Sequence, residues 1–297
     1  MVEERNFGSR VFDFFNIFLM FLLMVMTFYP IYYVLVASVS HPVQLFASTG
    51  LLLWPRGFAL YAYEIVLSNP WIWRGYANTV FYVIAGGSLR VFLTLLGGYV
   101  LSRRYLPGRN FFLTMIIITM FFSGGLIPTF LVVNAMGLTD TRWAMIFPGA
   151  ISTFNLIVTK TFLQGIPDEL EESGRIDGAN DWTILWRIIA PLATPVIAVI
   201  TLFYVVGIWN SFLTPIIYLR DRDLFPLQVI LREILLIGNQ DFTNLTVGDA
   251  GGRQDFSAYA DAVRYATIIV ATIPVLCVYP FLQKYFVKGV MLGAIKG

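Results

Sequence analysis

A polar stretch combines acids, arginines and glycines at spacings that suit a small folded unit. It covers residues 165–191 and reads GIPDELEESGRIDGANDWTILWRIIAP. Glu171 precedes Arg175 by four residues, the favourable orientation for an ion pair on a helix. Gly178 suits a helix end, since glycine accepts the left-handed conformation. Asp181 can cap a second helix. The stretch predicts a short acidic helix, a sharp turn and a second helix. Two interpretations of this stretch are open: it is a docking site for another protein, or it is an ordinary solvated loop.

Motifs for catalysis are missing from the sequence. There is no G-x-x-x-x-G-K-[ST] phosphate loop, no G-x-S-x-G and no H-E-x-x-H. His41 is the sole histidine and Cys277 the sole cysteine, which excludes a disulfide framework and most metal or histidine chemistry. A net charge of +2 is too small to indicate nucleic-acid binding. We therefore predict no catalytic residue, no metal site and no enzymatic activity.

Polar residues inside apolar runs are the remaining candidates for a site. Arg90 lies mid-run, where a charge must face a cavity or a partner, so it either attracts an acidic substrate or bonds helix-end carbonyls. Trp209 and Asn210 could stack on a sugar and bond its hydroxyls, or pack and bond between helices. Tyr204 is a weaker candidate of the same kind.

Composition defines the elements that must hold these residues. The chain of 297 residues is 58% hydrophobic and 13% charged, with a mean hydropathy of +0.73, whereas soluble domains are far less apolar. Such a chain is a polytopic membrane protein. Apolar windows of about 20 residues mark membrane helices. They predict an all-α fold in a single domain, 1–297, with six spans, at about 11–39, 76–101, 110–133, 143–163, 192–219 and 265–286.

Basic residues in the loops predict the orientation. A bias of Lys and Arg toward 1–10, 102–109, 160–191 and 287–297 places these segments and both termini in the cytoplasm. The folded polar stretch is then cytoplasmic. The long loop 220–264 lies outside, and apolar residues at helical spacing within it predict a short amphipathic helix on the outer surface.

The polar stretch resembles the EAA loop of ABC importer permeases. That pattern is EAA, three residues, G, nine residues, I-x-L-P, and it is met here by Glu172, Gly178, Ile188 and Pro191. Ser173 and Gly174 replace the two alanines, and Ala190 replaces the leucine; all three keep small or apolar character. The runs NTVFYVIAGG, WNSFLTPIIYL and YFVKGVMLGAIKG are similar to carbohydrate-importer (MalG-like) permeases, and the chain as a whole most resembles the LplC/YtcP group.

The resemblance implies a type I ABC importer permease in the cell (cytoplasmic or inner) membrane. Its implied partners are a homologous second permease forming a heterodimer, two cytoplasmic ABC ATPase subunits, an extracellular or periplasmic solute-binding protein and the lipid bilayer. The implied cargo is an oligosaccharide, in several members an acidic one. ATP and magnesium would be bound by the ATPase, so this subunit needs no cofactor.

The residues implied to couple to the ATPase follow the motif. They are Glu171, Glu172, Ser173, Gly174, Arg175, Asp177, Gly178 and Ala179. Glu172 would face a basic residue of the ATPase, Gly178 would make the turn, and small residues at 173 and 174 would admit a partner's backbone. The alternative is a self-sufficient secondary sugar transporter, which normally needs buried acids to couple ions, and none is found mid-span. An intramembrane enzyme would need a nucleophile and a base close together.

Overall fold

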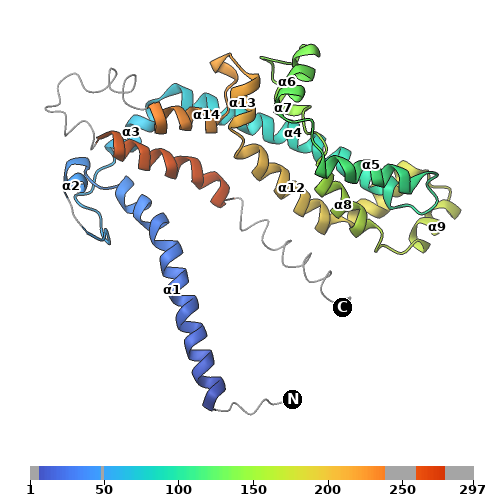
Figure 1. Ribbon diagram of the computed structural model, residues 1–297, viewed down its shortest axis with the longest axis horizontal. Helices are drawn as coiled ribbons and strands as arrows, with labels where there is room; N and C mark the ends of the chain where they lie inside the picture. Colours follow the sequence, from blue (N-terminus) through green and yellow to red (C-terminus); the bar gives the residue numbers. More distant parts are fainter. Residues whose placement is uncertain (1–6, 48–49, 238–258, 278–297) are drawn as a thin grey trace. The chain divides into compact units, whose positions relative to one another are not determined.

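Helices make up the secondary structure wherever the chain is described. The computed structural model describes residues 7–47, 50–237 and 259–277, and within these ranges there is no strand, only an antiparallel bridge between Ser40 and Phe58 (Figure 1). The all-α prediction is confirmed. The chain divides into two compact units, Met1–Pro70 with Leu231–Thr272 and Trp71–Ile230 with Ile273–Gly297. The prediction of one domain over 1–297 stays a prediction.

The first unit contains the long apolar helix α1 and two short helices. Its elements are α1 (Phe7–Ser38), α2 (Pro42–Phe46), α3 (Tyr61–Ser68) and most of a helix at Tyr259–Cys277. The C-terminal end of α1 carries a small core, in which Val36 and Ala37 pack with Leu52. The Tyr32 hydroxyl donates to the Leu53 carbonyl at 2.6 Å and so ties the following loop to the helix.

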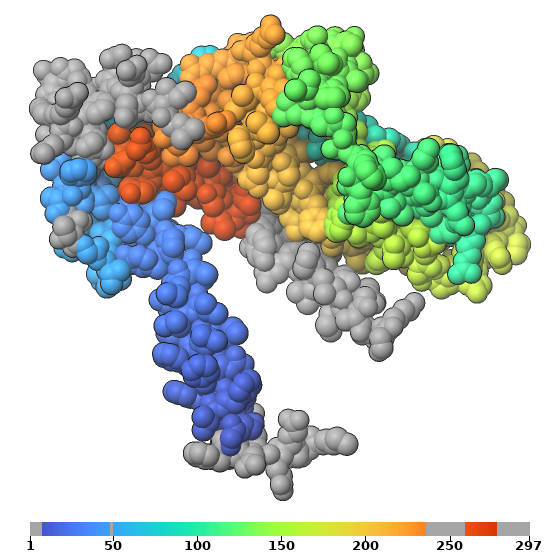
Figure 2. Space-filling view, viewed as in Figure 1, coloured from blue at the N-terminus to red at the C-terminus, as the bar shows by residue number. Residues whose placement is uncertain are grey.

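The rest of α1 has no cover within its unit. Its apolar window is 0% buried, and its side chains stand uncovered along the helix in Figure 2. A water-exposed helix this apolar would be unstable, whereas lipid solvates such a surface and the helix satisfies its own backbone groups. The predicted first span, 11–39, corresponds to a single helix, Gly8–Ser38, which is long and apolar enough to cross a membrane.

The second unit is built on α4 (Pro70–Ser102), a helix of 33 residues. Its core lies where α4, α8, η1 and α12 meet, with Tyr99, Leu163, Ile189 and Ile200 all buried. Its elements after α4 are α5 (Arg109–Phe121), α6 (Leu126–Ala135), α7 (Trp143–Ile146), α8 (Thr153–Leu163), α9 (Glu169–Ile176), α10 (Asp181–Thr183), η1 (Ile184–Ile189), α11 (Ala190–Leu192), α12 (Thr194–Trp209), α13 (Leu213–Tyr218) and η2 (Arg222–Leu224). The last helices, α14 (Leu227–Arg232) and η3 (Glu233–Ile237), cross the boundary between the units.

Three of the predicted spans are interrupted. The run 110–133 bends by 114° between α5 and α6, where Gly125 has a φ of +81°. The run 143–163 breaks after α7 at Pro148 and Gly149, and the run 192–219 breaks after Trp209. These predicted windows thus contain breaks that hydropathy did not indicate. Glycine or proline lies at two of them, at Gly125 and at Pro148 with Gly149.

Within the described residues, three helices are long and apolar enough to cross a membrane. They are Gly8–Ser38, Pro70–Ser102 and Tyr259–Cys277, and two bent pairs raise the number to five. The last of them begins before the predicted start at 265, and the predicted remainder, 278–286, lies outside the described residues. The chain is thus a multi-pass membrane protein.

The expected amphipathic helix in the loop 220–264 is present as α14, but it is not a surface helix. Leu227 and Ile230 are buried, and the Leu227 amide donates to the hydroxyl of Thr79 in α4 at 2.8 Å. Gly75 permits this approach, since a Cβ there would stand 3.0 Å from the Leu227 Cα. Apolar spacing predicted the helix, whereas a glycine far away in sequence decided its position. Residues 238–258 of that loop lie outside the described residues.

Candidate functional site

The polar stretch folds into two helices with a sharp turn between them. Asp168 precedes α9, and three acids, Glu169, Glu171 and Glu172, occupy its first turn, where they complement the positive end of the helix dipole. Gly178 ends the turn with a φ of +81°, as its type predicted. The helix–turn–helix prediction is confirmed by these elements.

The cap of the second helix differs from the prediction. Asn180, not Asp181, is the N-cap, and its side chain accepts from the Thr183 amide at 2.9 Å. Asp181 is instead the first helical residue, and it pairs with Arg175 at 2.8 Å. Both residue types cap helices well, so local preference alone did not separate them.

The two faces of α9 have opposite environments. Glu171 and Gly174 are buried, whereas Glu172, Ser173 and Ile176 are exposed, the last at 85%. The exposed face of α9 therefore offers both a charge and an apolar contact.

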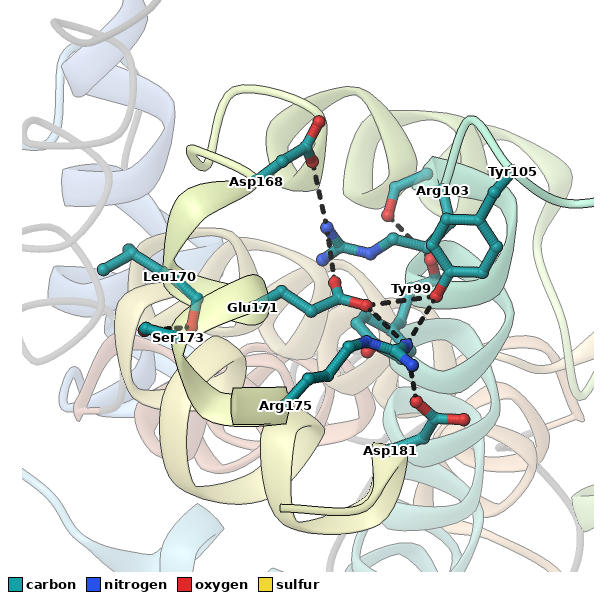
Figure 3. Close-up of polar contacts among 10 residues, drawn as sticks. Tyr99, Arg103, Tyr105, Asp168, Leu170, Glu171, Ser173, Arg175 and Asp181 are labelled. Atoms are coloured by element: carbon teal, nitrogen blue, oxygen red, sulfur yellow. Dashed lines mark hydrogen bonds and ion pairs between the residues drawn. The ribbon is translucent and has the colours of Figure 1, made fainter. Parts of the chain in front are cut away.

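Glu171 is the centre of a polar network (Figure 3). Its carboxylate forms an ion pair with Arg103 at 2.8 Å and another with Arg175 at 2.9 Å. The Tyr105 hydroxyl donates to the same carboxylate at 3.0 Å and accepts from Arg175 at 3.0 Å. Arg103 also reaches Asp168, at 3.4 Å. The predicted pair of Glu171 with Arg175 is confirmed, but Arg103 and Tyr105 were missed as partners.

Burial makes the contact between Glu171 and Arg103 stronger than a surface ion pair. Each side chain is only 5% exposed, so little solvent screens the pair. The Arg103 guanidinium also lies 4.7 Å from the centre of the Tyr99 ring, a cation–π contact. In the sequence, Arg103 belongs to the basic segment 102–109, which predicts orientation but does not indicate Glu171 as a partner.

The network also holds its proton donors in their protonated forms. The hydrogen bond to Glu171 raises the pKa of Arg175. The pKa of Tyr105 is raised mainly by burial and further by its bond to Glu171. Both groups therefore stay protonated, which keeps the bridge between the two arginines and the carboxylate intact.

Gly174 faces the protein itself and is not open to a partner. A Cβ at this position would stand 2.8 Å from the Ile188 Cδ1 atom and 3.5 Å from Ile184 Cγ1, both in η1. The expectation that Gly174 leaves space for another protein's backbone was wrong, because the small residue serves packing between α9 and η1. Ser173 is exposed and bonds the Leu170 carbonyl at 3.1 Å.

The other predicted residues of the loop occupy its turn. Asp177 is exposed at the C-cap of α9, and the amide of Ala179 donates to the Gly174 carbonyl at 2.9 Å. Ala179 is half-buried against the core of the second unit. Together with Gly178, these residues shape the end of α9.

Arg90 and Tyr204 bond to the backbone around the break between α7 and α8. Arg90 donates to the carbonyls of Met145 at 3.2 Å and Pro148 at 3.3 Å. The Tyr204 hydroxyl lies 2.7 Å from the Thr94 hydroxyl and accepts from the Ser152 amide at 3.0 Å. The Arg90 contacts match its structural interpretation, and Thr94 is a partner of Tyr204 that the sequence did not indicate.

Trp209 and Asn210 lie at the end of α12. The Trp209 side chain is buried, and its ring is tilted against that of Tyr76 at a centroid distance of 6.2 Å. Asn210 is exposed at the helix cap. Trp209 and Asn210 are thus neighbours in sequence with different surroundings, and only Asn210 is open. A role for either in binding a substrate stays a prediction.

Within the described ranges, no group of three or more His, Cys, Asp or Glu side chains is placed to hold a metal ion. Among the same residues, Glu171 is the one acid that is buried, and it is paired. The described residues thus define a helical, multi-pass membrane protein with one structured acidic loop.

Comparison with known proteins agrees with that class. Residues 4–292 match the family "Binding-protein-dependent transport system inner membrane component", and the chain belongs to this family. It is the permease component of an ABC importer.

Two curated relatives and one solved structure are similar along nearly the whole chain. Protein LplC of Bacillus subtilis (strain 168) is 41% identical over 98% of this chain and 96% of its own length. The polygalacturonan/rhamnogalacturonan transport system permease protein YtcP of the same organism is 42% identical over 100% of both. The crystal structure of a bacterial ABC transporter involved in the import of the acidic polysaccharide alginate contains a chain with a TM-score of 0.87. That chain is 32% identical, with 95% of this chain and 98% of that chain covered.

Proposed function

We propose that this permease forms half of the translocation pathway of an ATP-driven importer for acidic oligosaccharides, and that α9 with its turn couples it to the ATPase. The full assembly would contain a homologous second permease, two cytoplasmic ATPase subunits and a solute-binding protein. ATP binding and hydrolysis would occur in the ATPase. The permease would have six spans, with the broken runs 110–133, 143–163 and 192–219 each counted as one, and both termini in the cytoplasm.

The observation that carries the coupling role is the division of α9 into two faces. Glu171 and Gly174 hold the helix against its own protein, which leaves Glu172 and Ile176 pointing away from it. A rigidly held helix with an exposed acid and an exposed isoleucine suits a groove that has a basic residue and an apolar wall. A movement of the ATPase would then displace α9 as a rigid body.

One labelled position tests both the side of the membrane on which α9 lies and its contact with the ATPase. In a Cys277→Ala background, Ile176→Cys places a single thiol on the exposed face. A membrane-impermeant maleimide should label it in inside-out vesicles and not in intact cells, and added ATPase should protect it. Labelling from the outside would overturn the orientation, and labelling unaffected by the ATPase would overturn the docking face.

Coupling is tested with Glu172→Gln and Gly178→Val in the reconstituted importer. The first removes the exposed charge, and the second forces a β-branched residue into a left-handed turn. Both should keep the protein in the membrane but reduce uptake per ATP hydrolysed. Glu169→Gln, which removes a charge earlier on the same helix, is the matched control. Normal transport by both variants would refute the coupling role, and uptake without any ATPase would favour the secondary transporter.

The substrate class rests on the relatives. One similar permease is named for polygalacturonan and rhamnogalacturonan, and the similar structure is of an alginate importer. The reconstituted importer should take up uronate oligosaccharides in preference to neutral ones. Preference for a neutral sugar would refute this substrate class.

A further inference from the structure

We propose that Glu171 and Arg103 are a positioning pair that passes the movement of α9 to α4. The inference rests on the proposed coupling role of the loop. It concerns a different residue from the exposed Glu172: the buried acid beside it, which faces the permease itself.

The chain connects α9 to its neighbours in sequence but not to α4. On one side it continues from α8, and on the other it leads into α10 and η1. Arg103 follows the end of α4 directly, and Tyr105 lies just beyond it. The contacts from these two residues to Glu171, at 2.8 Å and 3.0 Å, therefore join α9 to an element that the backbone does not.

The type of contact determines whether a movement is transmitted. Apolar contacts between close-packed helices also transmit strain, but they are non-directional and not specific to one pair of side chains. A buried ion pair is different, because separating Glu171 from Arg103 would leave two charges with little solvent around them. The cation–π contact of Arg103 with Tyr99 fixes the arginine to α4 itself. A displacement of α9 must then carry the end of α4 with it.

The loop offers a second ion pair that serves as a control. Asp181 pairs with Arg175 at 2.8 Å, but both residues belong to the loop, and their side chains are 68% and 45% exposed. Asp181→Asn alters this pair within the loop and leaves the contacts of Glu171 with Arg103 and Tyr105 in place. A general effect of removing an ion pair from the loop should appear with both pairs, whereas a role in transmission should appear only with the pair that reaches the end of α4.

The test uses the purified importer in proteoliposomes, with uptake and ATP hydrolysis measured on the same assembled complexes. The double variant Glu171→Gln/Arg103→Met removes both buried charges, so neither is left unpaired in the interior to prevent assembly. We expect it to hydrolyse ATP but to transport about 10-fold less sugar per ATP. A change of this size lies within the usual range for energetic coupling between two sites in one protein. Asp181→Asn should keep the ratio of the unmodified importer, and Arg103→Lys, which retains the charge, should keep most of it.

The outcomes separate this inference from the coupling role on which it depends. If Glu172→Gln uncouples transport while the double variant keeps a normal ratio, α9 docks the ATPase but the positioning pair is refuted. If Asp181→Asn lowers the ratio as much as the double variant does, the pair only shapes the loop and the inference is again refuted. Should Glu172→Gln and Gly178→Val both transport normally, the coupling role itself fails.

Discussion

Thr159 of α8 lies directly against the bare backbone of Gly98 in α4. A Cβ at Gly98 would stand 2.8 Å from the Thr159 Cγ2 atom and 3.3 Å from the Lys160 amide nitrogen. Backbones approach this closely only where a residue has no side chain, and small residues are the usual means of packing helices in membranes. The glycine thus allows α8, which leads into the acidic loop, to pack on α4.

Gly98→Ala should destabilise the protein by about 1–3 kcal/mol, the usual range for overpacking a buried contact. The backbone nitrogen of Lys160 cannot move aside as a flexible side chain can. Gly87→Ala is the matched control in the same helix, since nothing lies within 4 Å of a Cβ there. It should be neutral or stabilising by up to about 1 kcal/mol through helix propensity. Thermal unfolding in detergent measures both, and equal stabilities would contradict the close packing.

Gly174→Ala should be tolerated, within about 1 kcal/mol, although the new Cβ would stand 2.8 Å from Ile188. The atom it meets is the terminal Cδ1 of a flexible side chain, and alanine gains helix propensity over glycine. Gly174→Leu should instead cost about 1–3 kcal/mol by forcing α9 away from η1. Unfolding curves of the two variants test this, and a stable leucine variant would show that α9 is not packed there.

Tyr204→Phe should cost about 1–3 kcal/mol, because it removes an acceptor from the Ser152 amide and a partner from Thr94. Thr94→Val removes the other side of the hydroxyl pair. Since the two hydroxyls are 2.7 Å apart, the double variant should cost less than the sum of the single ones. A double-mutant cycle on unfolding free energies measures the coupling. Strict additivity would mean that the two hydroxyls do not interact.

Asp140 should make the contact between its own loop and residues 220–221 sensitive to acid. The amides of Asp221 and Arg220 donate to its carboxylate at 2.8 Å each and lower its pKa. Its contribution to stability is therefore present above the ordinary aspartate pKa of about 3.9 and is lost as the pH falls through the lowered value. Asp140→Asn keeps an acceptor and tolerates the left-handed φ of 59° at this position. Unfolding followed from pH 6 downward should show a weaker acid dependence in the variant.

Predictions from local pattern succeeded where the physics is local. Gly178 was expected to end a helix and does so with a positive φ, and Glu171 was expected to pair with Arg175 one turn later and lies 2.9 Å from it. The apolar windows located the helices but not their breaks, such as that at Pro148 and Gly149. Hydropathy summed over a window is insensitive to one residue that cannot continue a helix.

Partners distant in sequence were not predictable. Arg103 for Glu171 and Thr94 for Tyr204 come from another helix, and neither pair follows from spacing. The sequence by itself determined that the chain is helical, lies in a membrane and carries an acidic loop, because composition and turn-forming residues act within a few turns. The tertiary structure alone decided that Glu171 and Gly174 face inward while Glu172 and Ile176 face outward. That choice depends on which helix packs beside α9.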